Sequence, residues 1–257
     1  MKPLIAGLRA ELVKLRKSWP LLISILSPVC MVGFILVLFW FSDAVVIRFR
    51  PGYRFWLDLN FTAWNLIVLP VIAAVVTEMS WEQDKDAVAW RHILHQPIPT
   101  INFYLAKLLS NYMLFWGCIL IMFLLLPLGG KILEKNEALP MGSLDVKLMF
   151  QYLIFTLSAS IPIVTFHTWF SFRFSGSGPG LGFAILGTWG TMKLIGITDL
   201  IQLLPWGLSS HSSIIFERWK ILPWNYCFGA LAVTILFVYV GSIDFSKHAF
   251  EKSLERK

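Results

Sequence analysis

The chain has 257 residues, of which 57% are hydrophobic and only 14% are charged. A soluble domain carries about 25% charged residues, so this composition argues against an ordinary soluble protein and indicates a membrane protein. The net charge of +7 does not indicate nucleic-acid binding, because the basic residues gather beside apolar stretches, where anionic lipid attracts them. The three cysteines lie in three separate apolar stretches and predict neither a disulfide framework nor a metal site.

Residues 1–19 predict an amphipathic helix that lies in the plane of the membrane surface. One face is apolar and the remainder is mostly basic: Leu4, Leu8, Leu12, Leu15 and Trp19 recur at helical spacing, against Arg9, Glu11, Lys14, Arg16 and Lys17. Two roles fit this pattern. The helix is either a plain membrane anchor or a lever that also touches a cytoplasmic partner.

Six long apolar stretches follow, each about as long as the 20 residues that a helix needs to cross the hydrocarbon core. They are Pro20–Phe41, Phe61–Met79, Phe103–Pro127, Leu148–Phe172, Leu181–Leu200 and Pro223–Ser242. The stretches are apolar all round, whereas the strands of a membrane β-barrel alternate polar and apolar residues. The predicted fold is therefore an all-α polytopic membrane protein, with one six-helix domain over residues 20–257.

The basic residues also predict an orientation, because Lys and Arg are enriched in cytoplasmic connections. With the N-terminus inside, twelve of them flank the inner ends of the spans and seven flank the outer ends. Six spans then return the C-terminus to the inner side. The last outer connection, about 201–222, is half apolar and rich in tryptophan, which predicts a re-entrant segment at the outer interface.

One inner connection, Thr77–Pro99, carries the only dense internal cluster of charges. Trp81 and Trp90 are interleaved with these charges, and no clean lipid-facing stripe results. A short helix that docks in a groove of a cytoplasmic protein would use a tryptophan as anchor and the surrounding charges to set register. The alternative is a plain solvated loop.

We find no pattern for catalysis on this chain. There is no H-E-x-x-H, no pair of carboxylates within a span and no nucleotide-binding loop, because Ser175–Gly178 lacks the G-K-[ST] ending. His92 and His95 share a helix face but have no further ligands nearby. The sequence therefore predicts no catalytic residue and no metal site, and an intramembrane enzyme stays a minor alternative.

Lys193 is the clearest ionisable residue within a predicted span, and such residues are costly enough to suggest a function. Either the helix breaks at Gly190 and Gly196, so that Lys193 reaches water, or Lys193 lines a polar interior and meets a substrate.

The chain resembles the membrane subunits of ABC transporters of the type-2 exporter class. The resemblance is carried by E-L-V-K-L-R-K at Glu11–Lys17, W-R-H-I-L at Trp90–Leu94, and the register of Glu82, Pro97 and Lys107. It is most similar to the permeases of the lantibiotic (bacteriocin) immunity and bacitracin-resistance branch. The acidic run between the second and third spans is richer than that branch's pattern.

The resemblance implies a multi-pass protein of the plasma (inner) cell membrane that works with partners. Two cytoplasmic ABC ATPase subunits would hold the ATP and Mg, so this chain would carry no cofactor, and a second permease chain would complete the complex. The segment about 78–96 would be the coupling helix. Its ATPase contacts would be Glu78, Glu82, Asp84, Lys85, Asp86, Trp90 and Arg91.

The resemblance also implies that the first, second and fifth spans border the translocation path, with residues 201–222 as its outer cap and Lys193 near it as path or outer gate. The leading hypothesis is ATP-driven export of an amphipathic compound, with an antimicrobial peptide as its first instance. A non-transporting scaffold or sensor subunit is the main alternative, since it would share the docking segment without needing a cavity.

Overall fold

A computed structural model describes residues 2–41, 52–85, 99–135, 142–174, 177–194, 201, 203–210 and 224–254. Within these ranges the structure is helical and holds no strand. The helices are α1 (Lys2–Leu15), α2 (Trp19–Phe41), α4 (Tyr53–Ala63), the π-helix η1 (Trp64–Val68), α5 (Leu69–Lys85), α7 (Thr100–Lys135), α8 (Val146–Arg173), α9 (Ser177–Leu194) and α11 (Trp224–Leu254).

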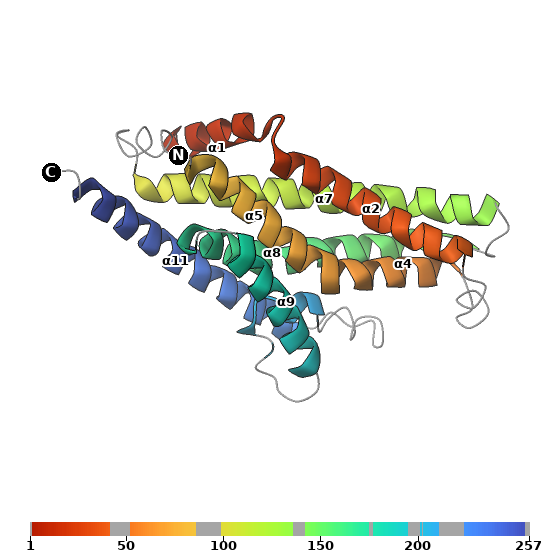
Figure 1. Ribbon diagram of the computed structural model, residues 1–257. Coiled ribbons are helices and arrows are strands. Elements are labelled where there is room, and N and C mark those ends of the chain that lie inside the picture. Colours follow the sequence, from red (N-terminus) through yellow and green to blue (C-terminus); the bar gives the residue numbers. More distant parts are fainter. Residues whose placement is uncertain are drawn as a thin grey trace.

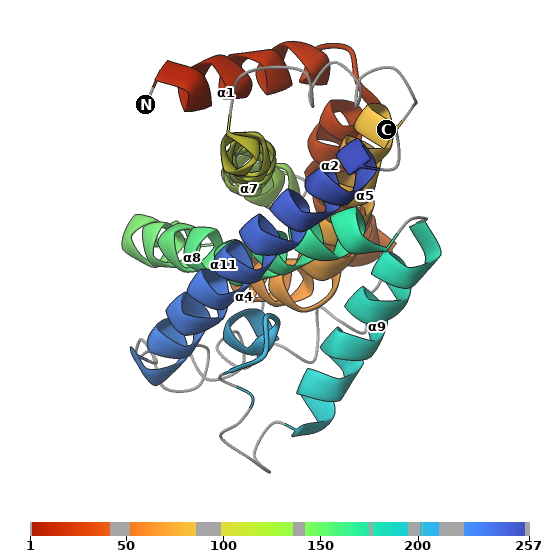
Figure 2. The ribbon, with the colours of Figure 1, turned by 90° about the vertical axis from the view of Figure 1, so that its left-hand side faces the viewer.

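Five helical segments are long and apolar enough to cross a membrane: Trp19–Phe41, Tyr53–Asp84, Thr100–Lys135, Val146–Arg173 and Cys227–Lys247. They run along a shared direction, and α1 crosses one end of the bundle (Figures 1 and 2). The all-α polytopic fold predicted from the sequence is thus confirmed. Several helices extend beyond the predicted spans, most of all the second, which begins at Tyr53 rather than at Phe61.

The fifth predicted span, Leu181–Leu200, is only partly described. α9 covers its first part, and residues 195–200 lie outside the described residues. α8 and α11 both run toward the end of the bundle that holds the two termini, so the chain must return between them, and α9 begins this return at a steep tilt (Figures 1 and 2). The count of six crossings and the orientation stay predictions.

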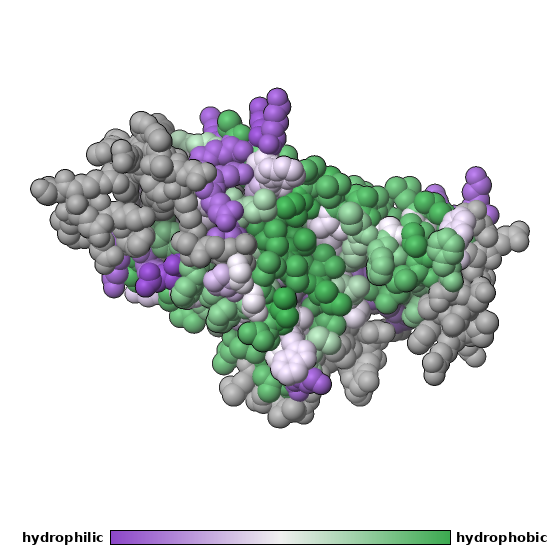
Figure 3. All heavy atoms as spheres, in the orientation of Figure 1, coloured by the Kyte–Doolittle hydropathy of each residue, from purple (hydrophilic) through white to green (hydrophobic). Residues whose placement is uncertain are grey.

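The surface of the bundle is that of a protein surrounded by lipid. Hydrophobic side chains form a broad band over the middle, and hydrophilic ones gather near α1 and at the opposite end (Figure 3). Phe41, Leu124 and Phe228 expose 82%, 71% and 68% of their surface. Apolar patches of this extent are rare on soluble monomers, so the band marks the part that the hydrocarbon core covers.

Close packing joins the second and third spans in the half of the bundle far from the two termini. The indole N–H of Trp56 donates to the Leu126 carbonyl at 2.9 Å, and both side chains are buried. Gly130 makes this approach possible, because a Cβ there would lie 2.2 Å from Cε1 of Tyr53. Without a hydrophobic driving force between helices in lipid, such contacts hold neighbours together.

The second span contains a wide turn at η1, between α4 and α5. Pro70 follows it and has no N–H to donate to the carbonyl of Leu66, four residues earlier, while the N–H of Leu69 bonds to the carbonyl of Trp64, five residues earlier. Within this turn Asn65 donates to the Phe61 carbonyl at 3.0 Å and to Oγ1 of Thr156 on α8 at 3.1 Å. The turn is therefore bonded to a neighbouring helix.

The segment 203–210 packs into the bundle. Trp206 and Leu208 are only 5% and 2% exposed, and the ring of Trp206 meets Phe166 of α8 edge-on at 5.1 Å. Gly187 of α9 lies against the indole, where a Cβ would be 2.6 Å from three ring carbons. Residues 211–222 lie outside the described residues, so the extent of the re-entrant segment stays a prediction.

The contact between Gly187 and Trp206 predicts opposite effects for two alanines on the same helix. Gly182→Ala meets no atom within 4 Å and should raise the melting temperature slightly, because alanine favours a helix by up to about 1 kcal/mol over glycine. Gly187→Ala should lower the melting temperature, because the buried indole cannot move aside. Thermal unfolding of the purified variants measures both, and equal shifts would contradict the packing described.

Candidate functional site

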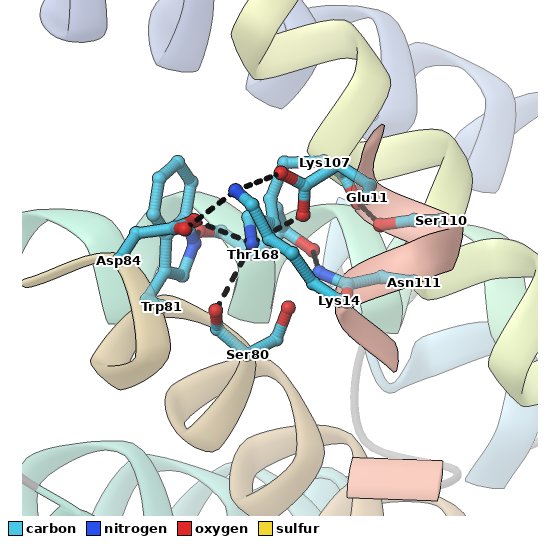
Figure 4. A network of polar contacts seen from close by, with 9 residues as sticks. All are labelled: Glu11, Lys14, Ser80, Trp81, Asp84, Lys107, Ser110, Asn111 and Thr168. Atoms are coloured by element: carbon cyan, nitrogen blue, oxygen red, sulfur yellow. Dashed lines mark hydrogen bonds and ion pairs between the residues drawn. The ribbon is translucent and has the colours of Figure 1, made fainter. Parts of the chain in front are cut away.

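Four charged side chains form a closed ring of ion pairs beside the start of the inner connection between the second and third spans. Lys107 Nζ lies 2.5 Å from Glu11 Oε2 and 2.5 Å from Asp84 Oδ2. Lys14 Nζ lies 2.6 Å from Glu11 Oε1 and 2.7 Å from Asp84 Oδ1. Each carboxylate thus bridges both ammonium groups, and we call Glu11, Lys14, Asp84 and Lys107 the charge ring (Figure 4).

The ring joins three elements that are far apart in the sequence. Glu11 and Lys14 stand one helical turn apart on α1, so they share a face. Asp84 lies at the end of α5, and Lys107 lies seven residues into α7, about 10 Å from its start at a rise of ~1.5 Å per residue. Lys107 also donates to the Ser80 carbonyl at 3.0 Å and lies 5.5 Å from the centre of the Trp81 ring.

Three members of the ring are buried, whereas Lys14 stands at its exposed edge, and the four charges compensate one another. Lys107 and Asp84 are both 3% exposed, and Glu11 is 8% exposed. Isolated charges are costly to remove from water, but two ammonium groups and two carboxylates sum to zero. Burial alone lowers the pKa of Lys14, and the carboxylates of Glu11 and Asp84 more than offset this, so that its pKa is raised above the ordinary value. Lys14 therefore stays charged at physiological pH.

Hydrogen bonds connect the ring to α8. The indole N–H of Trp81 donates to the Thr168 carbonyl at 2.8 Å, and the Asn111 amide donates to Oγ1 of the same residue at 3.1 Å. One turn earlier on α5, the hydroxyls of Thr77 and Ser171 are 3.1 Å apart. These polar contacts make α5, α7 and α8 one connected unit at this end of the bundle.

The structure separates the predicted ATPase contacts into three groups. Glu82 is exposed, whereas Glu78 and Asp84 are buried at 1% and 3% exposure, and Asp84 is held by both lysines of the ring. Lys85 is the last residue of α5. Asp86, Trp90 and Arg91 lie outside the described residues. The structure thus gives Asp84 an internal partner instead of a place on an open surface, and the coupling contacts stay a prediction.

Lys193 lies on the surface of the described chain. Its side chain is exposed at the end of α9, and its Nζ is 5.9 Å from the centre of the Trp189 ring. α9 continues through Gly190 without the break expected there, because one glycine costs a helix only about 1 kcal/mol. This placement in a single chain does not decide between the two interpretations of Lys193, so its role in a path or outer gate stays a prediction.

Sequence reasoning missed three of the four members of the ring as site residues. The sequence places Glu11 and Lys14 on the polar face of a surface helix and in the motif Glu11–Lys17, and Lys107 only in a motif. A signal was present, because Lys107 lies inside the predicted span Phe103–Pro127 and is followed by Ser110 and Asn111. An ionisable residue in a span calls for a partner, and the same criterion had been applied only to Lys193.

A comparison with protein families settles the class of this chain. The family model described as "ABC-2 family transporter protein" matches residues 7–190, which include the whole ring. The chain belongs to the ABC-2 transporter family. It is therefore the membrane subunit of a transporter, and the family works with ATPase subunits. Searches of curated proteins and of solved structures found no match.

Family membership confirms the broader resemblance predicted from the sequence and leaves its finer branch open. An ABC-2 permease is a multi-pass membrane protein and not itself an enzyme, as the apolar helices and the match together indicate. The similarity to lantibiotic-immunity permeases is not addressed by the match. Within the described ranges, no three His, Cys, Asp or Glu side chains are grouped to hold a metal ion.

The ring predicts a large effect for one lysine and none for another on the same helix. Lys107→Ala should destabilise the protein by about 3–5 kcal/mol, because it leaves Asp84 and Glu11 short of one buried partner. Lys131→Ala removes an exposed lysine near the other end of α7 and should leave stability unchanged. Chemical or thermal unfolding in detergent measures both, and similar melting temperatures for the two variants would rule out the ring as described.

Proposed function

We propose that this ABC-2 permease uses separate ATPase subunits to expel an amphipathic compound from the membrane, with an antimicrobial peptide as the first cargo to test. The complex would consist of two such permease chains, identical or similar, and two ATPases carrying ATP and Mg. We place it in the plasma membrane, with both termini and the charge ring on the cytoplasmic side.

The charge ring carries this proposal. It ties the last turn of α5, which forms part of the proposed coupling segment 78–96, to the surface helix α1 and to α7. A displacement of the coupling segment by an ATPase would therefore move α1 and the base of two spans together. This favours α1 as a lever in transmission over α1 as a plain anchor.

Two elements, α9 and the segment 203–210, meet α8 in a different way, which supports a relative movement. α9 and the segment 203–210 contact α8 largely through rings, such as Phe170 with Phe183 at 4.7 Å and Phe166 with Trp206. Contacts of this kind slide more easily than paired charges, because they have no fixed partner atoms. In our proposal α5, α7 and α8 move as one unit, and the outer segment beside Trp206 yields.

The charges of the spans support an amphipathic cargo over a small ion. Within the described spans, Asp84 and Lys107 are paired in the ring, and Asp58 meets Arg54 and the hydroxyl of Tyr152. An aqueous ion path needs polar groups that face water along its length. The broad apolar band instead suits a compound that is already dissolved in the lipid.

Purification of the complex tests the proposal directly. The tagged chain, extracted from its native membrane in mild detergent, should retain an ABC ATPase. The reconstituted complex should then reduce the amount of a fluorescent amphipathic peptide in vesicle membranes only with ATP, and an ATPase lacking its Walker lysine is the control. Retention of the ATPase without movement of any peptide would favour the scaffold or sensor alternative, and absence of an ATPase would refute the proposal.

The coupling segment predicts a variant that hydrolyses ATP without transport. Trp90→Ala combined with Glu82→Lys and Asp86→Lys removes the anchor and reverses two rim charges. This triple variant should insert normally and lose at least tenfold in transport per ATP hydrolysed. Trp40→Ala with Glu134→Lys makes similar changes at exposed positions near the other end of the bundle and should behave as wild type. Unchanged transport in the triple variant would remove the coupling assignment.

A further inference from the structure

A groove of about 570 Å³ runs along α11 on the side next to α7. Ile101 of α7 and the side chains of α11 between Thr234 and Lys247 line it. The second half of α11, which carries most of the lining, runs to the end of the bundle that holds both termini (Figure 1). Its volume falls within the range of about 300–1,000 Å³ that is typical of ligand sites, and none of its lining residues belongs to the charge ring.

The groove offers hydrocarbon contacts and few polar ones. Its serine and threonine hydroxyls are bonded within their own helix: Thr234 donates to the Ala230 carbonyl, Ser242 to Val238 and Ser246 to Ser242, at 2.6–2.8 Å. The large exposed side chains are Ile235 at 61% and Tyr239 at 65% exposure, and the Tyr239 phenol adds one polar group to them. A polar ligand would find no free hydroxyl hydrogen on these three side chains.

The length of the groove matches one leaflet of a bilayer. Thr234 and Lys247 are thirteen residues apart, which is about 20 Å along a helix. One leaflet contributes about 15 Å of hydrocarbon. The groove occupies the second half of the candidate span Cys227–Lys247 and ends where that span ends.

One cation stands at the end of the groove. Lys247 is exposed, and no ion pair joins it to another described residue. The nearby carboxylate of Asp244 is turned toward α8, where it accepts from the Trp169 indole at 3.2 Å and meets Arg173 at 3.8 Å. The groove thus has a mainly apolar lining and the positive charge of Lys247 at one end.

We propose that this groove binds an anionic phospholipid, with an acyl chain between α7 and α11 and the phosphate at Lys247. The small residues of the lining, which close helix pairing in membranes would use, alternate here with the bulky and exposed Ile235, Tyr239 and Ile243. A flexible hydrocarbon chain therefore fits the groove better than a helix of a second copy. The proposal needs only that the chain spans a membrane, so it is independent of the proposed export function.

The test compares two lipids on the purified full-length chain. The protein is reconstituted in vesicles of equal phosphatidylglycerol and phosphatidylcholine, extracted in mild detergent and analysed by native mass spectrometry. Wild type should retain phosphatidylglycerol about fivefold over phosphatidylcholine, the ratio expected from one lysine near the surface. Lys247→Glu should bring this ratio to one or below. Arg16→Glu, the same charge change at an exposed site near α1 and outside the groove, should keep it.

A second set of variants tests the apolar part of the groove. Val238→Trp fills the groove and should reduce retention of both lipids, and Ile243→Trp serves the same purpose if the first variant unfolds. Leu124→Trp, at an exposed site on α7 away from the groove, should retain lipid as wild type does. Enrichment that survives Lys247→Glu, retention that survives both groove tryptophans, or disulfide-linked dimers of a Tyr239→Cys variant would each overturn the proposal, the last by assigning the groove to a second copy.

Discussion

Four paired charges of alternating sign lie where the surface helix α1 meets the second and third spans, three of them buried, and the architecture of this end of the protein depends on their pairing. None of the three buried charges can lose its partners alone, because a single unpaired buried charge is far more costly than the pair is stabilising. Glu11, Lys14, Asp84 and Lys107 therefore set one another's positions. Their main effect is geometric: they decide where α1 sits relative to α5 and α7.

Away from the ring, the way in which helices are joined divides the molecule. Hydrogen bonds from Trp81 and Asn111 to Thr168 connect α5 and α7 to α8, and in lipid such bonds and close packing replace the hydrophobic effect between helices. The segment around Trp206 is seated largely by ring contacts and by the absence of a side chain at Gly187. A transporter needs both kinds of attachment, one to transmit a displacement and one to permit it.

The sequence was sufficient for five of the six predicted spans and for the helix α1, because both follow from local patterns of apolar residues. It was insufficient for the ring, since pairing Glu11 with Lys107 requires the tertiary arrangement of two helices almost a hundred positions apart. A sequence pattern also cannot tell an exposed charge from a buried one. Glu82 and Asp84 looked alike in the acidic run, yet one faces solvent and the other binds two lysines. Lys193, the lysine singled out, is exposed, and Lys107 is the one inside.

The wide turn at η1 has a consequence for how the length of this chain can vary. Its five-residue hydrogen bond accommodates one residue more than a regular turn while the helix continues on both sides. A one-residue deletion there would tighten the turn and keep the phase of the flanking helices. The same deletion in α4 or α5 would twist one half against the other by about 100°, at 3.6 residues per turn, and carry Asp84 away from its lysines. We therefore expect a one-residue deletion to be tolerated better around Asn65 than elsewhere in this span.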